Sequence, residues 1–153
     1  MTPEENLARL GLTLPDPAAP SANYVASVLH GDTLYLSGIG PQKPEGGFVT
    51  GRLGEDLDTR QGYEAARLCG LVLLVNMRKA LGSLDRVERI VKVLGMVRAV
   101  PDFGESPQVI DGCTDLFVDV FGEAGRPARS AVGMAALPRG IAVEIEAIVA
   151  VRK

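Results

Sequence analysis

The chain has 153 residues, of which 46% are hydrophobic and 23% charged, and a formal net charge of −3. This balance is typical of one globular domain spanning residues 1–153 and excludes a disordered chain. The 16 Lys and Arg residues are scattered, which argues against a nucleic-acid partner. No apolar run approaches the roughly 20 residues that span a bilayer. The acidic, polar start is unlike a signal peptide. We therefore expect a cytoplasmic protein with no membrane partner.

The front of the chain predicts a short helix over residues 2–11. Thr2 can cap this helix, Glu5 completes a capping box, and Gly11 can end it. Residues 14–20 carry three prolines, so they predict an extended arm with few backbone hydrogen bonds. Such an arm can lie across the body of the protein or across a neighbouring subunit.

Residues 24–29 and 33–37 are rich in β-forming residues and flank a turn, which predicts a hairpin. The only histidine, His30, lies in this turn, and one histidine cannot build a metal cluster. Residues 44–54 are rich in glycine but lack the lysine and Ser/Thr ending of a phosphate-binding loop. We interpret them as a surface loop and predict no metal and no cofactor.

Residues 58–82 predict the first long helix, with Asp58 as cap and a glycine at the end. The apolar stripe of this helix comprises Ala66, Cys69, Gly70, Leu73, Met77, Ala80 and Leu81. Residues 89–97 are almost continuously apolar, which favours a central strand covered on both sides. A second helix is expected to begin with Ser106 as cap and Pro107 as first residue.

Two further strands are expected at residues 126–136 and 143–151, joined by a turn at 137–140. The order is then β-β-α-β-α-β-β, which predicts an α+β fold with two helices on one face of a mixed sheet. Cys69 and Cys113 fall on apolar helical faces and are interpreted as reduced core thiols, with a reactive pair or a disulfide as the alternative.

The last two strands carry charged residues among apolar ones. Apolar strands are usually buried, and burying a charge is costly unless the charge is paired. Arg129 shares its strand face with small residues such as Ala131. Glu144 and Glu146 share one face of the last strand. A guanidinium can grip a small carboxylate with two hydrogen bonds, and a carboxylate can act as a base toward water. The alternatives are an ordinary Arg–Glu salt bridge or two solvated glutamates.

Tyr24 and Asp111 also have simpler explanations. An aromatic residue at the start of a strand usually packs against its neighbours. An aspartate early in a helix is favoured by the helix dipole.

Several motifs resemble those of the Rid/YjgF family of reactive-intermediate (enamine/imine) deaminases, long labelled endoribonuclease L-PSP. They are Pro127-Ala-Arg-Ser-Ala-Val, Leu137-Pro138, Val143-Glu-Ile-Glu-Ala-Ile, and the hairpin with Tyr24 and Leu36-Ser37-Gly38. The resemblance covers residues 22–151. It implies a chorismate-mutase-like fold and leaves residues 1–21, the helix and arm, as an addition.

The resemblance also implies a homotrimer with three clefts between subunits and hydrolysis, without a cofactor, of a 2-imino or 2-enamino acid to a 2-keto acid and ammonia. By position, Arg129 would hold the substrate carboxylate and Glu144 would position or activate water. Tyr24 would line the pocket from across the interface, with Ser37 and Gly38 in the pocket wall.

Two positions depart from the pattern of the well-characterised iminases. Ala131 stands where they have a cysteine, and Asp111 is the nearest match to a pocket asparagine. A carboxylate there would weaken binding of an anionic substrate unless it is turned away or protonated. These departures and the added residues 1–21 suggest a longer subgroup of the family.

Two other classes of function remain open. The same arginine cleft could bind a small carboxylate or another metabolite without turnover. A ribonuclease is disfavoured by the acidic balance and by the absence of a histidine pair or a metal cluster.

Overall fold

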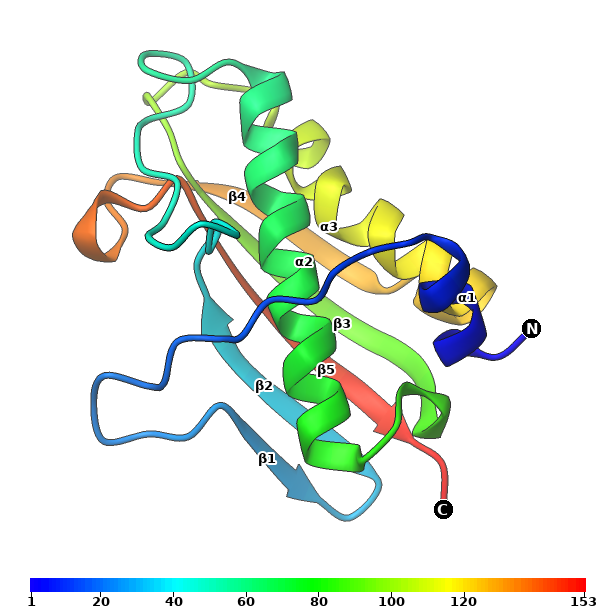
Figure 1. Cartoon of the computed structure of the whole chain (residues 1–153). Helices are drawn as coiled ribbons and strands as arrows, with labels where there is room; N and C mark the ends of the chain where they lie inside the picture. The colour runs from blue at the N-terminus through cyan, green and yellow to red at the C-terminus, as the bar shows by residue number, and fades with distance from the viewer.

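A computed structural model describes residues 1–153 as two layers, a five-stranded sheet and the helices packed on it (Figure 1). The elements in chain order are α1 (Pro3–Arg9), β1 (Ser27–His30), β2 (Thr33–Ile39), α2 (Thr59–Leu81), β3 (Val87–Arg98), α3 (Ser106–Phe121), β4 (Ala128–Met134) and β5 (Val143–Val151). The predicted α+β fold is confirmed.

The strand order is β1-β2-β5-β3-β4, and only the β3–β4 pair is parallel. β4 and β5 follow each other in sequence but are not neighbours, because β3 lies between them and pairs with both. The sheet is therefore mixed, as expected, and β4 forms one of its edges. The turn between the last two strands contains a short 3-10 helix, Pro138–Gly140.

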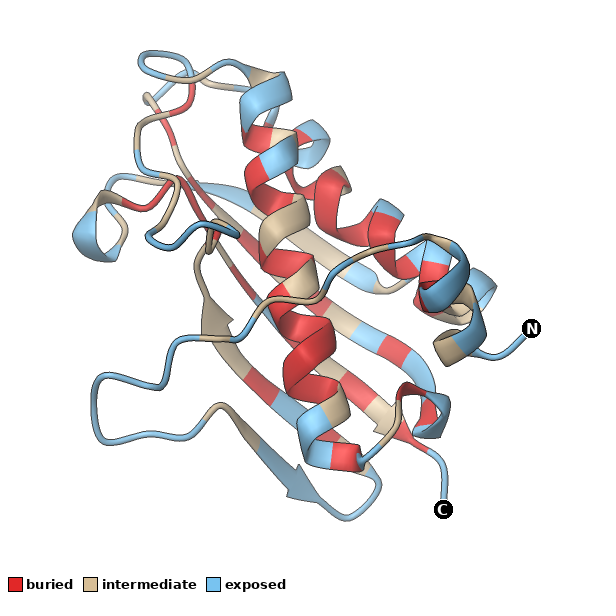
Figure 2. Ribbon diagram, viewed as in Figure 1, coloured by how far each residue is buried: buried red, intermediate tan, exposed pale blue.

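Helices α2 and α3 lie side by side on one face of the sheet, and many of their residues are buried (Figure 2). Glycine allows this close approach. A Cβ atom on Gly112 of α3 would collide with the carbonyl oxygen of Tyr63 on α2, and one on Gly70 would meet the side chain of Leu116. Cys69 and Cys113 are free, fully buried thiols in this layer, as predicted. Burial raises the pKa of both thiols, so both stay protonated.

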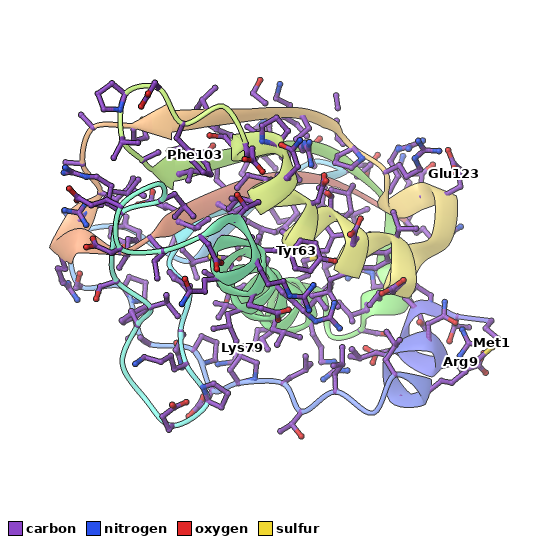
Figure 3. The ribbon with its side chains drawn as sticks, turned by 90° about the horizontal axis from the view of Figure 1, so that it is seen from above. Met1, Arg9, Tyr63, Lys79, Phe103 and Glu123 are labelled. Atoms are coloured by element: carbon purple, nitrogen blue, oxygen red, sulfur yellow. The ribbon has the colours of Figure 1, made fainter.

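The other face of the sheet carries no helix, as the view from above shows (Figure 3). The expectation that β3 is covered on both sides is therefore wrong for this chain, and burial alternates along its second half. Large apolar side chains remain exposed on this open face. They include Val28 (52% exposed), Tyr35 (46%) and Val132 (41%).

The predicted caps are confirmed at two of the three helices. Thr2 with Glu5 and Asp58 with Gln61 form complete capping boxes. The prediction of Ser106 as the cap of α3 is wrong. The cap residue is Glu105, which makes no capping hydrogen bond, and Ser106 lies inside the first turn and is buried.

Other expectations need smaller corrections. The first strand begins at Ser27 rather than at Tyr24. The loop 44–54 is not wholly a surface loop, because Leu53 is fully buried in the core. Ala80 is exposed, although the next residue of the predicted stripe, Leu81, is buried. His30 is exposed, as expected. None of the helices has both the length and the apolar character required to cross a membrane.

Candidate active site

Four of the residues singled out in the sequence line one cavity of about 530 Å³. They are Tyr24, Ser37, Gly38 and Glu144. Ser37 donates its hydroxyl hydrogen to the carbonyl of Val25 at 2.6 Å, which fixes the segment leading to Tyr24 against β2. The volume falls in the range of about 300–1,000 Å³ that is usual for small-molecule sites.

Glu144 reaches this cavity because β2 is irregular beside it. The pairing of β2 with β5 shifts between Leu36 and Ile39, and this irregularity brings Gly38 against the Glu144 carboxylate. A Cβ atom on Gly38 would lie 2.5 Å from Oε2 of Glu144. Partial burial, and then the nearby charge of Glu146, raise the pKa of Glu144. A carboxyl group with a raised pKa in a cavity has the character of a general base.

Arg129 lies at a second, smaller cavity of about 280 Å³. Its Nη1 donates to Oδ1 of Asp111 at 2.7 Å and to Oγ1 of Thr114 at 3.1 Å. Both partners are on α3, three residues apart, so they share one helical face and point together at the sheet edge. Asp111 is therefore the partner of Arg129, and its charge is not explained by the helix dipole alone.

This arrangement leaves one side of the Arg129 guanidinium free. The two hydrogens of Nη1 serve Asp111 and Thr114, whereas Nε and Nη2 make no hydrogen bond within the chain. Nε and Nη2 together form the side-on fork that matches a carboxylate. Contacts within the chain therefore leave this fork unused.

Arg129 and Glu144 lie on opposite faces of the sheet. Arg129 pairs with Val93, whose side chain faces the helices, whereas Glu144 pairs with Met96 on the open face. The strands that carry them, β4 and β5, are separated by β3. These two strands are therefore about 10 Å apart within the sheet. The alternative of an Arg–Glu salt bridge is wrong for Arg129, which pairs with Asp111.

The remaining predicted position, Ala131, points to the same face as Arg129 and packs against the core. Two polar residues near the cavities were not anticipated from the sequence. Thr114 lies three residues after Asp111, a spacing that could have indicated it. Asn76 interrupts the apolar run of α2, lines the larger cavity and is 6% exposed.

Residues 4–143 match the family model described as "YjgF/chorismate_mutase-like, putative endoribonuclease". The chain belongs to this family. The match includes Arg129 and ends one residue before Glu144, and it also takes in residues 4–21 of the front segment.

Two curated relatives span nearly the whole chain. Protein TCP17 of Trypanosoma cruzi is 49% identical over 145 residues, which is 94% of this chain and 91% of the relative. A 2-iminobutanoate/2-iminopropanoate deaminase of Dermatophagoides farinae is 32% identical over 139 residues, 90% of each chain. Among solved structures, that of a "putative endoribonuclease" from Shewanella oneidensis superposes with a TM-score of 0.94 at 32% identity, covering 99% of this chain and 100% of that one.

Proposed function

We propose that this family member hydrolyses small 2-imino or 2-enamino acids to 2-keto acids and ammonia, without a cofactor. The observation that carries the proposal is the free Nε–Nη2 fork of Arg129, held in place by Asp111 and Thr114. The fork suits the substrate carboxylate, and the raised pKa of Glu144 suits a base that orients or activates water. The deaminase activity named for the Dermatophagoides farinae relative supports this assignment.

The proposal includes a homotrimer whose clefts combine two copies of the chain. Arg129 from one copy would meet Glu144 and Tyr24 from its neighbour. Support comes from the opposite orientations of Arg129 and Glu144 in a single chain. The exposed apolar side chains of the open sheet face also need a cover, and a second copy offers one.

Ammonia release from imines generated in place by an amino-acid oxidase tests the activity. The wild-type protein should accelerate this release, because fixing the carboxylate beside a base lowers the barrier to attack by water. Arg129→Ala should abolish the acceleration, whereas Arg126→Ala, an exposed arginine in the same cavity, should leave most of it. Full activity of the Arg129→Ala variant would contradict the assignment.

Mixed assemblies test the shared cleft. Arg129→Ala and Glu144→Gln variants should each be inactive alone. Unfolded together in equal amounts and refolded, they should recover about a quarter of wild-type activity, because a cleft is intact only when both contributing copies carry the right residue. Failure to recover activity in assemblies proven to be mixed trimers would show that the site lies within one chain.

A binding module without turnover is the second candidate. The ion pair between Asp111 and Arg129 favours it, because a carboxylate beside the arginine reduces the positive charge available to an anionic substrate. This alternative predicts thermal stabilisation by 2-keto acids that is lost in Arg129→Ala, with no accelerated hydrolysis of any imine.

A further inference from the structure

The larger cavity extends well beyond Glu144. It continues around the edge of β2 to helix α2, where Val72 and Asn76 line its wall. β1 does not cover this edge, because its pairing with β2 ends at Leu36. The cavity therefore has room for more of a substrate than the carboxylate and the reacting imine carbon.

The N-terminal arm forms another wall of the same cavity through residues 18–21. Gln42 holds the arm with both ends of its side-chain amide. Its Oε1 accepts from the amide nitrogen of Ala18 at 3.0 Å, and its Nε2 donates to the carbonyl of Asp16 at 2.7 Å. Arg139 fastens the end of the arm by donating to Oγ of Ser21 at 3.1 Å. The arm is thus a fixed wall of the site.

Asn76 is the polar group in this part of the cavity that lacks a partner. The residue as a whole is 6% exposed, and its side-chain amide makes no hydrogen bond to another protein group. Its nitrogen and oxygen are not sealed from solvent, because the one buried side-chain N or O atom without a partner in this chain is Nε of Arg52. The Asn76 amide is therefore open to a ligand in the cavity. Apolar side chains also line this cavity, including Val72, Ile39 and Ile141.

We infer that this region is a side-chain subsite of the proposed deaminase, in which Asn76 selects substrates with an uncharged polar tip. The inference rests on the proposed function. An amide offers a donor and an acceptor side by side, so a carboxamide at the end of an apolar stem satisfies both. Glu144 in the same cavity disfavours a tip with a negative charge.

The test compares imines made in place from glutamine, methionine and glutamate, which have similar length and differ in their tips. The wild-type protein should have a higher kcat/KM with the glutamine imine than with the other two. Asn76→Leu should lower the ratio of glutamine to methionine kcat/KM about tenfold, the loss of about one neutral hydrogen bond. Asn76→Gln, which keeps an amide, should retain most of the preference.

Asn6→Leu is the matched control. Nδ2 of Asn6 donates to the carbonyl of Val120 at 2.9 Å, far from the cavity wall. This variant should lose stability and keep the substrate ratio. Asn76→Leu should keep its stability, because the substitution removes no hydrogen bond within the chain. A loss of stability in Asn76→Leu with an unchanged ratio would show that Asn76 is structural.

Other outcomes also decide the inference. Preference for the glutamate imine, or an unchanged ratio in Asn76→Leu, would overturn it while leaving the deaminase intact. If the wild-type protein hydrolyses no imine, the proposed function fails. The binding of 2-keto acids then tests whether the subsite exists. Thermal stabilisation by an amide-tipped 2-keto acid, lost in Asn76→Leu and kept in Asn6→Leu, supports the subsite, and equal stabilisation of both variants contradicts it.

Discussion

Asp111 accepts a hydrogen bond from Nη1 of Arg129 at 2.7 Å, and this contact orients the guanidinium without using its side-on fork. The pair explains how an arginine on an edge strand keeps one geometry, since Thr114 fixes the second hydrogen of the same nitrogen. It also places a negative charge close to the proposed position of a substrate carboxylate. We therefore expect Asp111 to position Arg129 and to limit its affinity for anions.

Replacement of Asp111 by its neutral isostere separates the effect of its hydrogen bond to Arg129 from the effect of its charge. Asp111→Asn keeps an oxygen that can accept from Nη1 and removes the charge, so we expect 2-keto acids to bind roughly three- to tenfold more tightly. Calorimetry or thermal shift measures the change. Asp119→Asn, the same charge change at an exposed position of α3 outside the cavity, should have little effect. Weaker binding to Asp111→Asn would mean that Asp111 itself contacts the ligand.

The raised pKa of Glu144 predicts the acidic limb of the pH–activity profile. A base must be ionised, so activity should fall as pH drops through a value above the ordinary 4.5. Glu146→Gln removes the second cause of the shift and should move the limb to lower pH, although burial will keep it above the ordinary value. A limb that does not respond to Glu146→Gln would assign the titration to another group.

The raised pKa of Glu144 also makes the stability of the protein depend on pH. Because burial favours protonated Glu144, its contribution to stability is fully present below the pKa of the unfolded chain and is lost as pH rises through the higher pKa of the folded state. Glu144→Gln should therefore stabilise the protein at neutral pH and have less effect in acid. Denaturant unfolding at the two pH values measures the difference.

The contact between the two long helices predicts a strong effect from one methyl group. Gly112→Ala would drive its Cβ into the backbone carbonyl of Tyr63, where no flexible side chain can give way. We expect a loss of about 2–3 kcal/mol, which lowers Tm by roughly 5–10 °C for a chain of this size. Gly104→Ala, where a Cβ meets nothing within 4 Å, is the control and should stay within about 0.5 kcal/mol. Equal Tm values for the two variants would contradict the packing.

Local signals in the sequence located most elements. The capping boxes at Thr2 and Asp58 and the apolar stripe of α2 act through neighbours three or four residues apart, so they are visible in the sequence. The cap of α3 was predicted one residue too late, because a serine followed by a proline fits the cap position and the first helical position equally well. The prediction that β3 is covered on both faces was wrong, since a mostly apolar strand has the same sequence pattern whether or not helices cover its second face.

The sequence by itself determined the α+β order, the arginine on a strand of small residues and the shared face of Glu144 and Glu146, because strand alternation and helix periodicity are local. Only the tertiary structure decided what these charges meet. Strand order put β3 between Arg129 and Glu144 and turned them to opposite faces, and the packing of α3 on the sheet gave Arg129 its partner in Asp111. Pairings between residues far apart in sequence follow from the register and packing of whole elements, which no local pattern encodes.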